Sequence, residues 1–124
     1  MKVRCIKVLN GVGEEVKESP WITLNTIYDV IEISISQTPE YRTYLRLITE
    51  NPIPAIYSLE QVELVDGSIP SNWIIQMYPP GTISLAPKPW LEPGFWERYF
   101  DYDPKAIKIY EEEIQKMGIE LNKS

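Results

Sequence analysis

Residues 26–48, with the sequence TIYDVIEISISQTPEYRTYLRLI, contain the pattern that decides the fold class of this chain. Their first part, residues 26–35, is rich in β-branched residues, which favour strands. Apolar side chains occupy both parities of this segment: Ile27, Ile31, Ile33 and Ile35 on one, Tyr28 and Val30 on the other. This distribution predicts a strand that is buried on both faces or that contains a bulge.

The second part of the stretch predicts a partner strand. A polar turn containing Gln37, Thr38 and Pro39 precedes residues 41–48, in which two kinds of side chain alternate. The two sets are Tyr41, Thr43, Leu45 and Leu47 on one side, and Arg42, Tyr44 and Arg46 on the other. Such alternation is typical of a half-exposed antiparallel strand.

Three further short strands are expected around this hairpin. Residues 2–9 are β-rich and end at a glycine-containing turn, which indicates a first strand. Residues 55–58 can pair back as a fourth strand. A single helical turn at residues 59–62 then leads into a last strand at residues 63–66.

Five short antiparallel strands of this kind predict an α+β fold that begins with a small SH3-like β-barrel or curled sheet. The positions Leu24, Asn25, Tyr28 and Val30 resemble the SH3-like pattern in which a leucine and a turn residue precede a tyrosine and valine strand. Asn25 stands where glycine is commoner. The acidic and aromatic set of SH3 domains that bind proline-rich peptides is not evident, so the resemblance implies the barrel and not that ligand.

Residues 67–103 have a different composition, with six prolines, three tryptophans and little periodicity. Large apolar side chains argue against a flexible linker, so we expect an ordered aromatic loop region. Within it, residues 93–100 are expected to form a short helix. Its aromatic face is expected to cap an open end of the barrel.

The last part of the chain predicts a C-terminal helix at residues 104–117. Asp103 suits the N-cap, Pro104 suits the first helical position, and Gly118 suits the stop. Apolar residues share one face at helical spacing, namely Ile107, Tyr110, Ile114 and Met117, with Ala106 and Ile109 widening it. Glu111 and Glu112 are expected to point largely to solvent.

Length and composition indicate a single domain over residues 1–124, made of a β-rich part (1–66), the loop region (67–103) and the helix (104–117). The single cysteine, Cys5, has no partner for an internal disulfide, which favours a reducing compartment. Charges at Lys2, Arg4 and Lys7 interrupt any apolar run at the N-terminus. We therefore expect neither a signal peptide nor a membrane span, and a cytoplasmic protein.

The chemistry available to the side chains argues against an enzyme. The chain has no histidine, the commonest general base and metal ligand, and its lone cysteine has no evident activation. Gly11 and Gly13 do not extend into a dinucleotide or phosphate-binding motif. Carboxylate pairs such as Asp101 and Asp103 remain possible, but Asp103 is already explained as a helix cap. We expect no catalytic residues, no metal and no cofactor.

Charge and aromatic content instead favour a binding protein. The net charge is −6, and no run of Lys or Arg is present that could follow a phosphate backbone, which disfavours direct binding of nucleic acid. An acidic surface attracts a positively charged partner, although it can also serve solubility alone. Eight tyrosines and four tryptophans supply the kind of side chain that dominates protein interfaces.

This layout is similar to immunity proteins of bacterial contact-dependent and polymorphic toxin systems: a short acidic chain with an SH3-like start, the element GFWERYF at residues 94–100 and a terminal helix. The resemblance implies a protein that binds a cognate toxin domain, often a nuclease, and blocks its active site or its access to substrate. The candidate partner-binding residues are the acidic Glu97, Asp101, Glu111 and Glu112, and the aromatic Trp90, Trp96 and Tyr102.

Each of these residues also has an alternative role in solvation or packing. Two other functions remain open. One is an SH3-like protein- or peptide-recognition adaptor that adds a partner strand to an exposed strand of the barrel. The other is a small enzyme that uses carboxylates. The sequence leaves the oligomeric state unknown.

Overall fold

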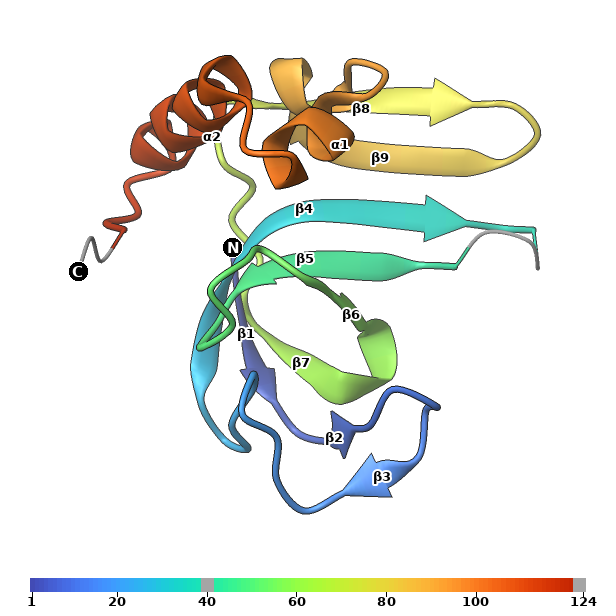
Figure 1. Cartoon of the computed structure of the whole chain (residues 1–124). Helices are drawn as coiled ribbons and strands as arrows, with labels where there is room; N and C mark the ends of the chain where they lie inside the picture. Colours follow the sequence, from blue (N-terminus) through green and yellow to red (C-terminus); the bar gives the residue numbers. More distant parts are fainter. Residues whose placement is uncertain (39–41, 122–124) are drawn as a thin grey trace.

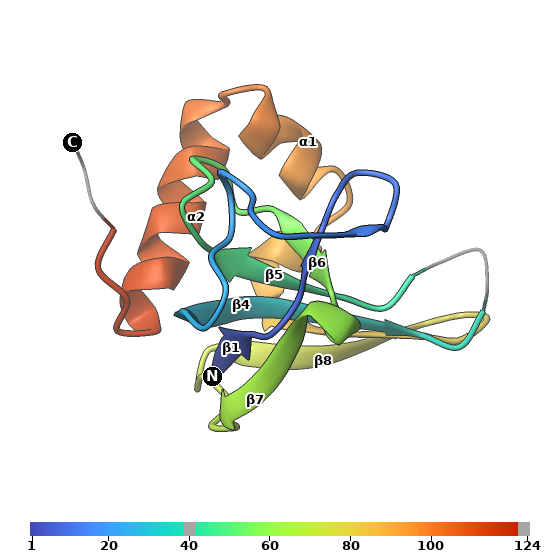
Figure 2. The same cartoon turned by 90° about the horizontal axis from the view of Figure 1, so that it is seen from below.

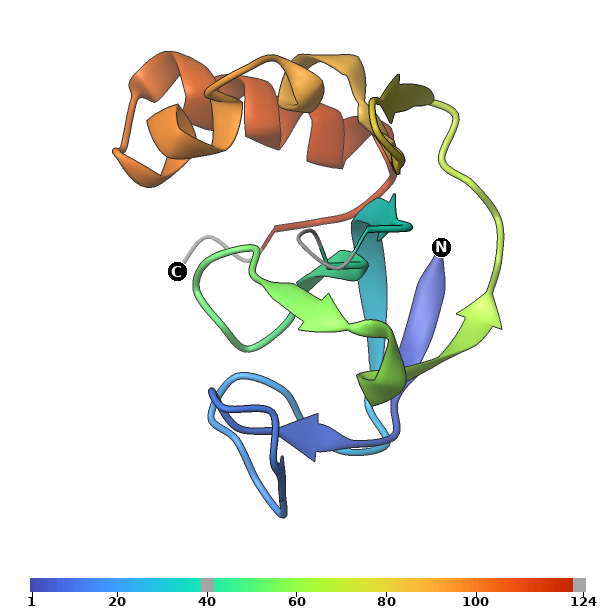
Figure 3. The same ribbon diagram turned by 90° about the vertical axis from the view of Figure 1, so that its right-hand side faces the viewer.

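One bent antiparallel sheet carries a helical layer on one of its faces in the computed structural model, which describes residues 1–38 and 42–121 (Figures 1 and 3). The strands are β1 (Lys2–Cys5), β2 (Val8–Leu9), β3 (Glu15–Val16), β4 (Ile27–Ser36), β5 (Tyr44–Ile48), β6 (Ile56–Ser58), β7 (Val62–Asp66), β8 (Trp73–Tyr78) and β9 (Thr82–Pro87). The helical elements are the 3₁₀ turns η1 (Leu59–Gln61) and η2 (Lys88–Leu91) and the helices α1 (Phe95–Phe100) and α2 (Pro104–Lys116).

The main sheet has the strand order β6-β5-β4-β1-β7, and all of its pairs are antiparallel. β1 therefore lies between β4 and β7 (Figure 2). β4 is long enough to pair with β1 through its first residues and with β9 through its last ones, and β8 continues the sheet beyond β9. The expected α+β class with an antiparallel sheet and a C-terminal helix is confirmed. The sheet formed by the described residues is open.

A bulge in β4 accounts for its apolar residues on both faces. Val30 pairs with Leu47 and Glu32 pairs with Arg46, so Ile31 is an extra residue without a counterpart on β5. Val30 and Ile33 consequently face one side of the sheet, and Ile31 faces the other. Both readings of the sequence pattern are thus correct, because β4 is buried on two sides and the bulge exchanges its faces.

Two hydrophobic cores lie on the two sides of the sheet. The first is enclosed by the curled part and contains Val3, Cys5, Val8, Ile22, Tyr28, Val30, Leu45, Leu47, Tyr57 and Trp73. The second lies under the helical layer and contains Ile31, Ala86, Trp90, Phe95, Ala106, Tyr110 and Ile114. The aromatic residues of the α1 region therefore cover the outer face of the sheet, and the expectation that they cap a barrel end is wrong.

Strand boundaries differ from the sequence-based expectation at the N-terminus. The first strand ends at Cys5, because the backbone N–H groups of Ile6 and Lys7 both donate to the carbonyl of Gln61 and turn the chain away. Val8–Leu9 then pairs with Glu15–Val16 in a separate small hairpin.

Asn25 has a φ of 66°, which lies in the left-handed region. Asparagine tolerates this region better than most residues, which explains why it can stand where glycine is commoner.

Two other strand predictions need correction. The expected strand over residues 41–48 begins at Tyr44; its first position, Tyr41, and the turn residue Pro39 lie outside the described residues. It is not half-exposed, because Arg46 is 7% exposed and lies beneath the helical layer. The fourth strand, η1 and the last strand occur where they were predicted.

The largest difference concerns residues 67–103, where the expected loop region contains the β-hairpin of β8 and β9 (Figure 1). The residues Pro79, Pro80 and Gly81 connect its strands. Pro87 ends β9 and is tolerated because a proline at a strand end removes no ladder hydrogen bond that is needed. The predicted short helix is present as α1, one turn and a half in length.

The predicted C-terminal helix is confirmed as α2. The Asp103 carboxylate accepts a hydrogen bond from the Lys105 N–H at 3.2 Å, and Pro104 occupies the first turn. At the other end, Gly118 has a φ of +75° and its N–H donates to the carbonyl of Gln115, while Ile119 donates to Ile114. This pair of bonds is a Schellman motif, which ends the helix and returns the chain toward the second core.

Candidate functional site

The seven candidate residues occupy three different environments on the helical layer. Trp90 is 2% exposed and stacks on the Tyr110 ring, with 5.3 Å between the centroids. A side chain so fully buried offers no contact area to a partner. The assignment of Trp90 as a binding anchor is therefore wrong, and its role is to fill the second core.

Trp96 is half-buried and takes part in a polar cluster with Glu32 and Arg46. Its indole N–H donates to Glu32 Oε1 at 3.2 Å, and the Arg46 guanidinium carbon lies 3.9 Å from the centre of the indole ring. Arg46 also donates to Glu32 Oε2 at 3.2 Å and to the Pro54 carbonyl at 2.7 Å. The cluster fixes α1 to the sheet and holds the loop before β6.

Sequence reasoning did not single out Glu32 and Arg46. The sequence did contain a signal for Arg46, because this charged residue stands between two apolar ones, Leu45 and Leu47, in a predicted strand. The sequence offered a bulge in this strand as one alternative but did not give its position at Ile31, which places Glu32 on the same face as Arg46.

The remaining candidates are accessible to a partner. Tyr102 is 82% exposed at the corner between α1 and α2, where a φ of 62° directs the chain. Glu97 and Asp101 are exposed on and after α1, and Glu112 is exposed on α2, whereas Glu111 is half-buried. Tyr102, Glu111 and Glu112 line the same hollow, while Glu97 and Asp101 are not among its lining residues.

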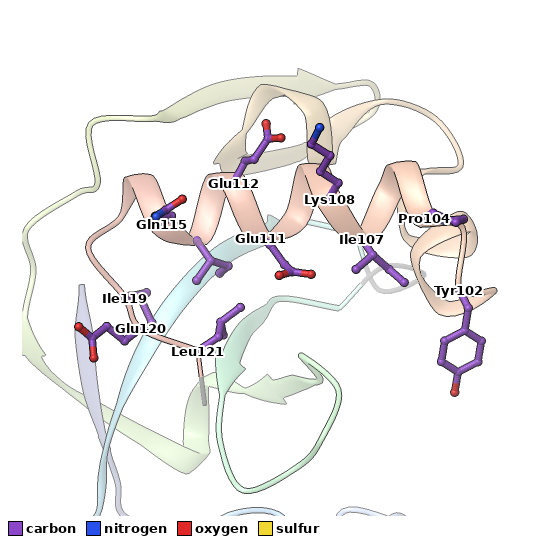
Figure 4. Close-up of a pocket in the computed structure, with 11 residues that line it drawn as sticks. Tyr102, Pro104, Ile107, Lys108, Glu111, Glu112, Gln115, Ile119, Glu120 and Leu121 are labelled. Carbon is purple, nitrogen blue, oxygen red and sulfur yellow. The ribbon is translucent and has the colours of Figure 1, made fainter. Parts of the chain in front are cut away.

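This hollow, shown in Figure 4, adjoins a second one, and together they form a surface that we call the acidic groove. The first hollow, about 760 Å³, runs along α2 from Tyr102 to Gln115 and is bounded by residues 119–121. The second, about 670 Å³, lies between α2 and the loop of residues 48–54. Ile107, Glu111, Glu120 and Leu121 line both hollows.

Negatively charged side chains outnumber positively charged ones in the lining of the acidic groove. Its lining includes four carboxylates, from Glu50, Glu111, Glu112 and Glu120, and a single amine, from Lys108. Between them lie apolar side chains, namely Ile48, Ile53, Ile107, Ile114, Ile119 and Leu121. An elongated apolar floor with a net negative rim suits a segment that presents Lys or Arg side chains around apolar contacts.

Besides Tyr102, the phenols of Tyr99 and Tyr110 line the groove. Burial raises the pKa of Tyr99 and, more strongly, that of Tyr110, so both phenols stay uncharged to a higher pH than an exposed tyrosine does. Glu50 at the far side of the groove accepts hydrogen bonds from the Tyr28 hydroxyl at 2.7 Å and from the Thr23 hydroxyl at 3.2 Å. These bonds hold its carboxylate in place.

Comparisons with known proteins identify no relative: no family model, no curated protein and no solved structure matches the chain. Over residues 1–38 and 42–121 no group of three or more His, Cys, Asp and Glu side chains could hold a metal ion. Neither α1 nor α2 has the length and apolar character that crossing a bilayer requires, and no other helix of the described ranges has them. The acidic groove is therefore the feature of the described residues that bears on function.

Proposed function

We propose that this chain is an acidic binding protein whose partner docks in the acidic groove, and that it acts as an immunity protein that neutralises a cognate toxin domain. The observation that carries the proposal is the four-to-one excess of carboxylates over amines around an apolar floor. A chain with this role binds its partner and does not catalyse a reaction.

A nuclease domain is the toxin class that fits this surface best. Nucleases hold phosphate groups with Lys and Arg side chains, and an acidic surface competes for the same cations. Long-range attraction then accelerates the encounter, and contacts with the apolar floor slow the dissociation. The groove would occupy the cationic surface of the toxin and exclude its substrate.

The predicted residues divide between these tasks. Glu111 and Glu112 supply negative charge within the groove, and Glu97 and Asp101 extend it along the α1 side. Tyr102 is the best-placed aromatic anchor, since 82% of it is accessible at the groove end. Trp96 acts mainly by positioning α1 over the sheet.

The test uses the toxin domain encoded by the gene immediately before the one for this chain, measured by surface plasmon resonance over a series of salt concentrations. The double variant Glu112→Lys, Glu120→Lys should lower the association rate by about tenfold or more, because it reverses two charges of the steering surface. Association with the wild type should itself slow steeply as salt rises.

The matched control is the double variant Glu14→Lys, Glu15→Lys. It makes the same change of net charge at two exposed positions in the small β2–β3 hairpin, away from the groove lining. It should retain most of the wild-type association rate. Equal losses in the two double variants, or no binding by the wild type, would reject the groove as the docking site.

A second candidate function is an SH3-like protein- or peptide-recognition adaptor. We infer an SH3-like arrangement for residues 1–66 from the strand order and from the 3₁₀ turn η1 before the last strand. β7 is an edge strand of that part, with Leu64 64% exposed, and could accept a partner strand. Strand addition depends on backbone hydrogen bonds, so salt-independent association would favour the adaptor over the immunity protein.

A further inference from the structure

The β8–β9 hairpin stands out by its lack of charge. Residues 67–87 contain no Asp, Glu, Lys or Arg, although these four types make up 24% of the chain. β8 nevertheless exposes large apolar side chains: Ile74 is 37% exposed, Ile75 63% and Met77 73%. Edge strands are usually protected by charges, prolines within the strand or a covering element, and β8 carries neither a charge nor a proline.

The open edge of β8 can be assigned residue by residue. Within the described ranges β8 pairs with β9 alone. Trp73 lies opposite Pro87, which has no N–H, and the Trp73 N–H donates to the Pro70 carbonyl at 3.1 Å, so this is a non-hydrogen-bonded pair of the ladder. Because antiparallel pairs alternate, the N–H and C=O groups of Ile75 and Met77 point away from β9.

The same two residues complete an apolar surface on one face of the sheet. Registered partners share a face, which gives two rows across β4, β9 and β8. The rows are Ile33, Leu85 and Ile75, and Ile35, Ile83 and Met77. Ile33, at the start of the first row, packs against the first core. At the other end of the two rows, on β8, Ile75 and Met77 are exposed.

We propose that β8 is a dimerisation edge, at which a second copy of this chain adds its own β8 antiparallel about a two-fold axis through Gln76. In this register Ile75 of each copy lies opposite Met77 of the other, and their outward N–H and C=O groups form four hydrogen bonds. The apolar rows then continue from one copy into the next. This edge is separate from the acidic groove and does not depend on its function.

A second copy is the occupant that the charge distribution favours. Two chains of net charge −6 repel each other in most relative orientations. The repulsion is weakest when residues 67–87 of the two copies face each other, because this stretch has no charged side chain. A two-fold contact requires a surface that is complementary to itself. The edge of β8 meets this requirement, because its outward N–H groups can donate to the outward C=O groups of an antiparallel second copy. A basic partner, by contrast, would gain nothing from this uncharged hairpin.

Cysteine cross-linking tests the register. In the proposed dimer the two Gln76 residues form a non-hydrogen-bonded pair, with Cα atoms about 4.5 Å apart, within the range for a disulfide. Mild oxidation of Gln76→Cys should therefore yield a covalent dimer on non-reducing gels. The native Cys5 is buried and does not interfere. Leu64→Cys, at a similarly exposed edge position on β7, is the control and should yield no covalent dimer on the same gels.

Light scattering after size exclusion, over a concentration series of the full chain, tests the dimer itself. The wild type should have the mass of two chains, and Met77→Lys should have the mass of one with an unchanged circular dichroism spectrum. Leu64→Lys places the same charge on the other edge and should remain dimeric. The proposal is overturned by a monomeric wild type, by a dimer that survives Met77→Lys, or by cross-linking of Leu64→Cys as readily as Gln76→Cys.

Discussion

The Glu32 and Arg46 side chains form an ion pair inside the protein, only 4% and 8% exposed. Removal of both charges from water is costly, and the pair persists because each member has further partners: the Trp96 indole for Glu32, and the Pro54 carbonyl and the Trp96 ring for Arg46. A pair of this kind stabilises little as a whole. The loss of one member, however, leaves the other charged and unpaired.

Arg46→Met should therefore lower the free energy of unfolding by about 3–5 kcal/mol, as measured by urea denaturation. The double variant Glu32→Leu, Arg46→Met should recover most of this loss, because no unpaired charge remains. Arg4→Met is the control, because Arg4 pairs with Glu63 at the surface, where the two side chains are 39% and 51% exposed. It should lower the free energy of unfolding by about 1 kcal/mol or less. Similar costs for Arg46→Met and Arg4→Met would refute this account.

At the level of elements, the ends of α2 determine where the groove lies. The Schellman motif at Gly118 reverses the chain so that Ile119 packs back on the second core and Leu121 reaches the groove. Residues 119–121 form one wall of the first hollow as a consequence. A helix that continued past Met117 would carry these residues away from α2 and open that wall.

Gly118→Ala should destabilise the protein by about 1 kcal/mol, measured by thermal or urea unfolding. A Cβ at this position meets no atom within 4 Å, so the cost is conformational and comes from the φ of +75°. Gly11→Ala is the matched control, since its Cβ also meets nothing and its φ lies outside the left-handed region. It should be neutral or slightly stabilising. A neutral Gly118→Ala would argue against the Schellman termination.

The elements that the sequence predicted are those with a clear local signal. β4 was anticipated from its β-branched residues, β5 from its alternation and α2 from its caps, all of which act within a few residues. β8 was missed because its sequence, WIIQMY, has no alternation and is followed by two prolines, which together resemble a loop. Its strand character comes from pairing with β9, whose own place is set by β4. The candidate site shows the same limit, since Tyr102, Glu111 and Glu112 were named from the sequence, whereas Glu50 joins them through tertiary packing and Glu120 through the chain reversal at Gly118.

Considered as a whole, the molecule is one sheet between two cores, and tyrosines occupy both. Burial raises the pKa of six of them: Tyr28, Tyr44, Tyr57, Tyr78, Tyr99 and Tyr110. A raised pKa means that the folded chain holds the phenol proton at a pH where the unfolded chain has released it. The associated stability is complete below the unfolded pKa, near pH 10, and is lost as the pH rises above it.

The free energy of unfolding should therefore change little between pH 6 and 8, where no histidine titrates, and should fall above about pH 10. Urea titrations at a series of pH values measure this. Tyr110→Phe removes the most strongly shifted phenol and should reduce the loss between neutral and alkaline pH, relative to the wild type. An identical alkaline loss in both proteins would show that the Tyr110 phenol is not a source of it.

The extra residue in β4 has a consequence for how the gene can change in length. If Ile31 were deleted, Val30 and Glu32 would become consecutive residues opposite Leu47 and Arg46, so the strand would pair regularly and the side chains from Glu32 to Ser36 would keep their sides. A one-codon deletion here would thus remove one buried side chain from the second core and leave the first core as it is. Any homologue that aligns with a gap at this position can keep a strict alternation of apolar residues through this strand, and that regular pattern is a criterion by which distant members of this fold can be recognised.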